Sequence, residues 1–418
     1  MRCSTVTHSA KTPTTHRNII LFYGLAIAKN AIFVEGNWFF FWLRVMTHQQ
    51  MGWVDAIGFS FGLMMDIPAG AISDMMGKRR TLLLAMLSCA VGWFIMAACQ
   101  DTTGIMVGFL LSVLGGSFYS GAEEALAYET LKMTQDEDRF ERIISNANML
   151  AIFSLIVASL VGGLLYTIDV RLPYFAWGLS ALGGLVCAWF VIEPDAEHEP
   201  FTAQAYIHQM KSGFRQLSQP VLRPFIPLIM GLVGMTFLFT DGLVQPAVAE
   251  HMGFDAGGQA VAFAIIAGLA AAVTYFVPWL RKQFGAWTFL VILTVFMAVG
   301  FWGAGSVIGL SGFVMLLLIR LTGTVALPWV SIVINEHVPS RDRATTLSTV
   351  ALITKIPYAL TAVIAGHLAE IGKIGTFTSW IGVFLVGLTL TSVFLMARPM
   401  PLSAPQFEST VEKAGAVL

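Results

Sequence analysis

The stretch Gly70-Ala71-Ile72-Ser73-Asp74-Met75-Met76-Gly77-Lys78-Arg79-Arg80 decides which fold this chain is expected to adopt. An apolar run ends there in an acid and a glycine, and three consecutive cations follow. Because basic loops resist translocation while apolar segments insert, cations directly beside an apolar run mark the cytosolic side of a membrane. The stretch therefore predicts a tight turn between two transmembrane helices at the cytosolic surface.

The composition of the whole chain fits a membrane setting. Of its 418 residues, 56% are hydrophobic and 12% are charged, whereas soluble domains carry about 25% charged residues. The formal net charge of −1 excludes a strongly basic nucleic-acid-binding protein, so no nucleic-acid partner is expected. The cysteines show no paired or metal-like spacing, so the sequence predicts neither a disulfide framework nor a metal site: Cys3, Cys89, Cys99 and Cys187.

Twelve apolar runs are long enough to cross ~30 Å of hydrocarbon as helices. They lie at 18–45, 53–73, 80–99, 104–130, 143–166, 172–192, 224–249, 258–280, 287–307, 311–336, 345–369 and 375–397. The sequence thus predicts an all-α integral membrane protein of twelve transmembrane helices in two pseudo-symmetric six-helix bundles, at 18–192 and 224–398. The polar linker 193–223 is expected to contain a short interfacial helix, between cytosolic tails at 1–17 and 399–418.

The distribution of cations predicts the orientation. If both termini are cytosolic, eighteen of the 24 Lys and Arg residues fall on inside segments and three fall outside. An internal repeat supports two parallel halves, because a shift of 208 residues superimposes Gly77 on Gly285, which Arg281 and Lys282 precede. Proteins built from such repeats hold their site between the halves near the middle of the membrane.

The opening stretch resembles the signature of the major facilitator superfamily, G-x-L-x-D-R-x-G-R-R, from which Ile72 and Met75 depart. The resemblance covers roughly residues 18–398. It implies a monomeric secondary transporter, embedded in the lipid bilayer of the cytoplasmic membrane, that moves a small molecule by alternating access without a cofactor. In the family, the signature acid contacts the start of the eleventh helix and closes the cytosolic side. The resemblance therefore implies a cytosolic gate made of Asp66, Gly70, Asp74, Gly77, Lys78, Arg79, Arg80, Arg341 and Arg343.

Two motifs of drug exporters are altered in this chain. The arginine usual in the fourth helix is replaced by Ser112, and an Arg-x-x-Gly appears instead in the tenth run at Arg320. The fifth run lacks the proline of the exporter pattern. Both departures weaken an assignment to proton-driven drug export.

Ionisable residues within the apolar runs are the candidates for transport, because they cost ~2.5–3.5 kcal/mol on insertion scales and so tend to line a pathway or pair with one another. The proton-coupling candidates are Glu35, Asp241, Glu123 and Glu124. Glu35 and Asp241 are the first pair to test, because they lie at similar depth in pseudo-equivalent helices. Glu123 and Glu124 are adjacent on a helix, so at most one is expected to face the cavity.

The candidates for lining the substrate cavity are polar or aromatic: Lys29, Asn30, Asn37, Tyr119, Gln245, Arg320, Trp329, Lys355 and Tyr358. Lys29 and Arg320 could instead form purely structural ion pairs with Glu35 or Asp241. Pro246, close to Asp241 and Gly242, predicts a bend in the seventh helix. Pro357 is expected to loosen the eleventh helix beside Lys355.

The function expected from these features is proton-coupled secondary transport. Efflux by antiport is favoured, because an aromatic- and Met-rich chain suits a small amphipathic substrate. A proton-coupled uptake symporter of a small metabolite is the alternative, and a transport-inactive receptor or scaffold is a second one. An enzyme is not expected, since the chain has no H-E-x-x-H, no G-x-S-x-G and no Cys/His metal cluster.

Overall fold

The computed structural model describes residues 6–194, 211–339, 343–355 and 358–397, and in these ranges every regular element is a helix. The first half of the chain contains α1 (Val6–Asn30), α2 (Trp38–Leu43), α3 (His48–Met76), α4 (Lys78–Ala98), α5 (Thr102–Lys132), a 3-10 turn (Glu137–Arg139), α6 (Phe140–Ile168) and α7 (Leu172–Phe190). The expected all-α architecture is confirmed. α1 begins within the segment that was expected to be a polar tail.

The second half follows a linker of which residues 211–217 are described as helical. It contains α9 (Ile226–Thr240), α10 (Val244–His251), α11 (Ala256–Thr274), α12 (Val277–Gln283), α13 (Ala286–Ala304), α14 (Gly309–His337), α15 (Arg343–Lys355), α16 (Tyr358–Glu370) and α17 (Ile374–Ala397). The start of the expected interfacial helix of the linker, through residue 210, and the tail 399–418 lie outside the described residues. So does Pro357.

The described residues contain nine helices long and apolar enough to cross a membrane, or eleven if each of two bent pairs is one span. The twelfth expected span is the first, 18–45. It is missing from this tally because α1 starts in the polar N-terminal region and ends at Asn30, and the chain is irregular from residue 31 to 37. The sequence predicted one continuous helix there, and that prediction of continuity is wrong.

Two other spans bend. α3 turns by 44° at Ile67, next to Pro68, which lacks the N–H needed for the helical ladder. α9 and α10 meet at 69° across residues 241–243, which confirms the bend expected near Asp241 and Pro246. Irregular backbone at membrane depth is tolerated only where it is buried in protein or lines a water-filled cavity. These breaks therefore point to a cavity.

The turn predicted from the opening stretch is present. α3 ends at Met76 and α4 begins at Lys78, so a single residue connects the two helices. That residue, Gly77, has a φ of 87°, a left-handed conformation that favours glycine because it has no Cβ. The carboxylate of Glu193, just after α7, accepts hydrogen bonds from the backbone N–H groups of Lys78 (2.5 Å) and Arg79 (2.9 Å) and so caps the start of α4.

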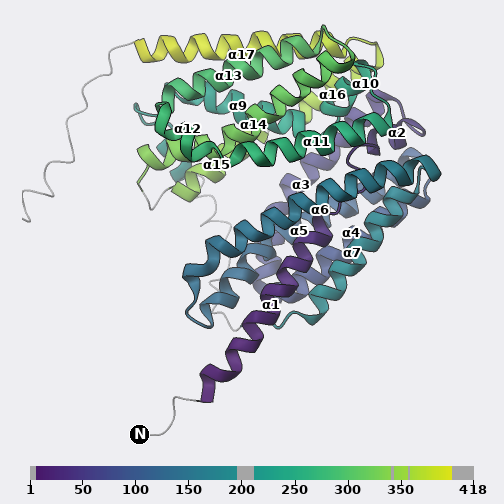
Figure 1. Cartoon of the computed structure of the whole chain (residues 1–418), viewed down its shortest axis with the longest axis vertical. Helices are drawn as coiled ribbons and strands as arrows, with labels where there is room; N and C mark the ends of the chain where they lie inside the picture. The colour runs from purple at the N-terminus through teal and green to yellow at the C-terminus, as the bar shows by residue number, and fades with distance from the viewer. Residues whose placement is uncertain (1–5, 195–210, 340–342, 356–357, 398–418) are drawn as a thin grey trace, which may run out of the picture.

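The two halves meet at one end and diverge at the other (Figure 1). They pack through α3 against α16 and through α6 against α11. We call the end that carries α2 and α10, with the start of α3 and the end of α16, the closed end. The other end carries Gly77, the start of α1 and α15, and we call it the open end. The open end is where the halves lie apart in Figure 1.

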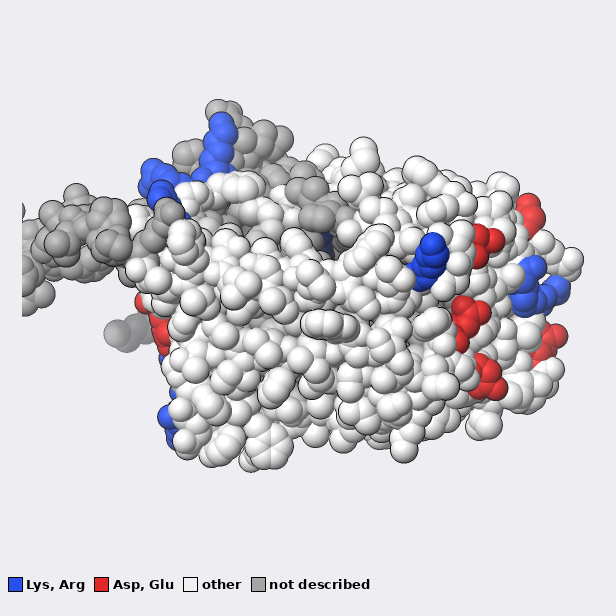
Figure 2. Space-filling view, turned by 90° about the horizontal axis from the view of Figure 1, so that it is seen from above, with Lys and Arg blue, Asp and Glu red and all other residues white. Residues whose placement is uncertain are grey.

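The outer surface suits a lipid environment. Figure 2 looks onto the second half, where charged residues gather toward the two ends and the surface between them is almost uncharged. Large apolar side chains are exposed on α13 and α17, among them Phe296, Trp302, Trp380 and Phe384, which are each at least half exposed. A band of exposed apolar surface between two charged rims matches a membrane-spanning protein.

Candidate transport cavity

A cavity lies between the two halves, near the closed end. It holds about 820 Å³ of empty space including its mouth, within the range of sites for small organic molecules. The first half contributes Ile32, Val34, Glu35, Trp38, Trp42, Asp55, Trp93, Met96, Phe109, Ser112, Tyr174 and Trp177, and the second half contributes Thr240, Asp241, Gly242, Gln245, Pro246 and Phe263. The irregular segment 31–37 supplies Glu35, the break between α9 and α10 supplies Asp241, and α3 supplies Asp55.

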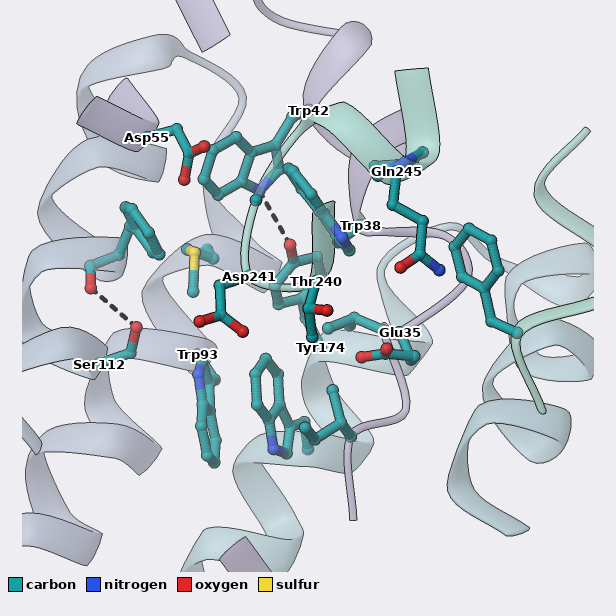
Figure 3. A pocket seen from close by; sticks show the side chains of 18 residues that line it. Glu35, Trp38, Trp42, Asp55, Trp93, Ser112, Tyr174, Thr240, Asp241 and Gln245 are labelled. Atoms are coloured by element: carbon teal, nitrogen blue, oxygen red, sulfur yellow. Dashed lines mark hydrogen bonds between the residues drawn. The ribbon is translucent and has the colours of Figure 1, made fainter. Parts of the chain in front are cut away.

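Two predicted carboxylates come together in this cavity. Figure 3 shows Asp241 reaching into its middle, with Glu35 and Gln245 on one side and Asp55 on the other. Arg320 of α14 lies close enough to interact electrostatically with both Glu35 and Asp241. The guanidinium also donates a long hydrogen bond, 3.5 Å, to Oε1 of Gln245. The cavity thus combines acids from both halves with one cation from the second half.

Lys355, at the end of α15, is a second cation near Asp241. Its ammonium group lies 5.0 Å from the centre of the Phe237 ring, within the range of a cation–π contact. Lys355 was expected to line the substrate cavity; it lies near Asp241 but is not among the residues that line the central cavity.

Aromatic side chains form the rest of the wall. Trp93 and Trp177 stack with their ring centres 3.8 Å apart and an interplanar angle of 13°. The Trp42 indole N–H donates to the Tyr174 hydroxyl at 2.9 Å, which fixes both rings (Figure 3). Flat, rigid rings offer a large contact area to an apolar ligand at low entropic cost. The sequence analysis did not single out these tryptophans, because tryptophan in an apolar run is more often a packing residue.

A smaller polar cavity lies within the first half. It is lined by Ala26, Lys29, Asn30, Ile32, Gly116, Tyr119, Ser120, Glu123, Ala147, Asn148 and Ala151. It brings together four predicted residues, and Lys29 interacts electrostatically with Glu123. The Lys29 ammonium also lies 5.7 Å from the ring centre of Trp93, a wall of the central cavity. Glu124, by contrast, is exposed outside it, as expected for adjacent helical residues.

Two predicted cavity residues lie elsewhere. Trp329 is completely buried in the second half, where its indole N–H donates to the Ala286 carbonyl at 3.0 Å and its ring packs against Phe289. Asn37 is also completely buried, and its amide donates to the Phe33 carbonyl at 3.2 Å. Placing either in the cavity is therefore wrong for this conformation. The indole N–H of Trp329 is satisfied by nearby backbone, whereas Oδ1 of Asn37 is buried without a hydrogen-bond partner among the residues that the structure describes.

At the closed end, polar contacts join the two halves. Nε2 of His48 lies 2.9 Å from Glu250 and Nδ1 lies 3.5 Å from Glu370. Deeper in, the carboxylate of Asp55 accepts a 2.6 Å hydrogen bond from the Tyr358 hydroxyl. Tyr358 was expected to line the cavity and instead supports the acid that does. Asp55 and His48 were missed, although Asp55 lies within the apolar run 53–73 and was a visible signal.

At the open end, the residues of the predicted gate make contacts within their own halves. Asp74 pairs with Lys78 at 2.8 Å, and the Lys78 ammonium lies 3.9 Å from Glu129. Asp66 accepts a hydrogen bond from Ser117 at 2.9 Å. In the second half, Arg343 donates to the Val338 carbonyl, and Arg341 lies outside the described residues. The contact between Asp74 and the start of the eleventh helix stays a prediction for the opposite conformation, with Gly70, Arg79 and Arg80 beside it.

The architecture defines a class. Membrane-spanning helices in two halves that enclose a central polar cavity, open toward one end, are typical of transporters. The chain belongs to the Major Facilitator Superfamily, whose family model matches residues 20–327. It is therefore a multi-pass membrane protein of this superfamily.

Known relatives are distant. The chain is 24% identical over 237 residues to the multidrug resistance protein MdtL of Klebsiella pneumoniae and 26% identical over 247 residues to the multidrug resistance protein MdtH of Edwardsiella ictaluri. Each match covers 56% of this chain and 58% of the relative. The chain thus spans less than two-thirds of the length of these relatives.

Solved structures share the fold. The nucleoside transporter NupG superimposes with a TM-score of 0.74 over 92% of this chain and 100% of that chain, at 12% identity. An auto-inhibited peptide transporter of the POT family superimposes with a TM-score of 0.66 over 93% of this chain and 99% of that chain, at 13% identity. At such identities the likeness supports the fold alone.

Proposed function

We propose that this chain exports a small amphipathic molecule across the cytoplasmic membrane by alternating access, driven by proton entry. The observation that carries the proposal is the central cavity, which Glu35 of the first half and Asp241 of the second half both line, and Arg320 interacts electrostatically with both acids. A site shared by both halves can change its exposure when the halves rock. The distant relatives named multidrug resistance proteins support export.

The lining of the cavity supports an amphipathic substrate. Stacked tryptophans form an apolar wall, and the carboxylates and Gln245 provide a few polar groups that can orient a ligand. Because aromatic contacts are tolerant of ligand shape, such a wall accepts several related molecules, while the charged groups select among them. Carboxylates at the same site can exchange a proton for a polar or charged part of the substrate.

The orientation follows from the cations. Lys78, Arg79 and Arg80 lie at the open end, and so do Arg281 and Lys282 at the end of α12. Basic segments favour the cytosol, so the open end faces the cytosol with both termini, and the structure represents an inward-facing conformation. In this conformation the cavity can take up substrate from the cytosol. The single chain encloses the site, and we propose that it acts as a monomer.

Flux measurements test the proposal. Inverted vesicles with an acidic interior would be loaded with a pH-sensitive dye, and ethidium, a neutral amphipathic probe and a zwitterionic probe would be added in turn. We expect at least one probe to release protons from wild-type vesicles, and the response to be lost with Glu35→Gln and with Asp241→Asn. The matched Asp101→Asn variant changes an acid that caps α5 and does not line the cavity, and it should respond like wild type.

Either of two results would overturn the proposal. One is that no probe moves protons in wild-type vesicles, although the protein is folded and inserted. The other is that both carboxylate variants retain the wild-type proton response. In that second case the acids of the cavity would have a structural role as ion-pair partners of Arg320.

A further inference from the structure

Asp55 is an acid of the first half that is held by the second half. It lies on α3, is 5% exposed and borders the central cavity. Its carboxylate accepts hydrogen bonds from the Tyr358 hydroxyl at 2.6 Å and from the backbone N–H of Leu243 at 3.3 Å. Tyr358 begins α16, and Leu243 lies in the break between α9 and α10. Both donors would leave Asp55 if the halves moved apart at the closed end.

Gly242, in the break between α9 and α10, leaves the space that this contact occupies. A Cβ atom added to Gly242 would lie 2.5 Å from Oδ2 of Asp55 and would overlap the Tyr358 hydroxyl. The ring of Tyr358 is in turn held against Phe59, with the ring centres 4.2 Å apart. Glycine at position 242 therefore allows α3, α16 and the break to converge on one carboxylate.

Closing the halves also brings Asp55 toward a second acid. Asp241 borders the same cavity from the second half and interacts electrostatically with Asp55 (Figure 3). Glu35 is a third acid in this space. Arg320 interacts electrostatically with Glu35 and Asp241, and Lys355 interacts with Asp241. Three carboxylates against two cations leave one negative charge uncompensated. Like charges confined in a poorly solvated space repel strongly, and one bound proton removes that repulsion.

We propose that Asp55 and Asp241 form a carboxylate pair across the two halves, and that this pair binds one proton when the closed end closes. The inference rests on the proposed coupling to protons and assigns its site. A proton from the solution at the closed end binds a carboxylate oxygen of the pair while that end is open. Closure then traps it, and the proton leaves through the open end of the cavity. The bound proton is assigned to the pair and not to one acid, because two interacting carboxylates titrate as a unit.

Two other titratable groups lie close to the carboxylate pair, and their responses to pH must be distinguished from that of the pair. His48 lies between Glu250 and Glu370 at the rim of the closed end and could add its own response to pH. Tyr358 faces Asp55 directly, as a neutral hydrogen-bond donor. The experiment therefore includes a variant that removes His48 and a variant that removes only the hydroxyl of Tyr358.

The test measures the conformational equilibrium of the full-length protein in lipid nanodiscs without any substrate. Spin labels are placed at Ile168→Cys and Leu310→Cys, two residues that are 75% and 80% exposed at the closed end of opposite halves, after the native cysteines have been replaced. The distance distribution gives the ratio of the closed to the separated arrangement. For one proton linked to closure, this ratio should rise by up to about tenfold for each unit by which the pH is lowered.

The variants give distinct expectations. Asp55→Asn keeps an oxygen that can accept from Tyr358 but removes the charge, so the closed end should stay closed at all pH values. Tyr358→Phe should reduce the closed fraction at all pH values and retain its pH dependence. His48→Gln and Asp101→Asn should both respond to pH as wild type does. Asp241→Asn should abolish the response, which keeps the test informative if Asp55→Asn does not fold.

Two outcomes would overturn the carboxylate pair: an unchanged pH response in Asp55→Asn and Asp241→Asn, or its loss in His48→Gln alone. The result is independent of flux. A pH-dependent distance without probe-driven proton movement would refute the transport proposal and support the pair. Proton-coupled flux with a pH-independent distance would support transport and refute the pair.

Discussion

Gly366 of α16 is where a single methyl group should shift the conformation of this protein. A Cβ atom at this position would lie 2.6 Å from the backbone oxygen of His48 and 3.0 Å from the Cα atom of Gly52, both on α3. The obstructing atoms are backbone atoms of the opposite half, so no side chain can rotate away. Alanine at 366 is thus compatible with separated halves and incompatible with the closed end as it stands.

The size of the effect follows from this geometry. An ordinary contact distance for a Cβ atom begins at 3.4 Å, so α3 and α16 would have to separate by about 0.8 Å at this point. Forcing one extra methyl group into a well-packed contact costs about 1–3 kcal/mol. Because the cost applies only when the halves are in contact, we expect Gly366→Ala to lower the ratio of closed to separated arrangements by about 5- to 150-fold.

Spin labels at positions 168 and 310 would report this ratio directly. The matched control is Gly183→Ala in α7, where an added Cβ atom has no other atom within 4 Å. The control should match wild type, and its unfolding temperature should not fall. If Gly366→Ala leaves the distance distribution unchanged while the control behaves as expected, the close approach of α3 and α16 does not limit closure and the reasoning fails.

Two further predictions concern the ends of α4. Glu193→Ala removes the carboxylate that caps the first two N–H groups of this helix, so hydrogen exchange at the turn around Gly77 should quicken by about 2- to 30-fold, the equivalent of about 0.5–2 kcal/mol. Glu193→Gln keeps one acceptor oxygen and should show a smaller change. Equal exchange rates in wild type and both variants would contradict the cap. At the other end of α4, burial raises the pKa of the Cys99 thiol, so less thiolate is present at neutral pH. Maleimide labelling of Cys99, followed by mass spectrometry, should be slower than that of free cysteine, and its rate should rise with pH into the alkaline range. A labelling rate equal to that of free cysteine at pH 7 would contradict the burial of this thiol.

The sequence determined the parts of this protein that depend on local chemistry. Hydrocarbon selects long apolar helices whatever surrounds them, so the apolar runs identified the helices. The signature stretch Gly70–Arg80 indicated the family. Gly77 and the three following cations located the turn between α3 and α4, because a left-handed residue and a basic cluster are local features. Pro246 near Asp241 indicated the break between α9 and α10 for the same reason.

The packing of the two halves decided the rest. Asp55 and Tyr358 are 303 residues apart in the chain, and their contact exists only because α3 and α16 meet at the closed end. Whether Trp329 faces a cavity or a neighbouring helix cannot be read from its own apolar run, since both sides of a buried helix are apolar. Which acids share a space, and which end is open, depend on how two rigid halves are placed relative to one another. That placement is a balance of contacts between distant segments, and no single stretch of sequence contains it.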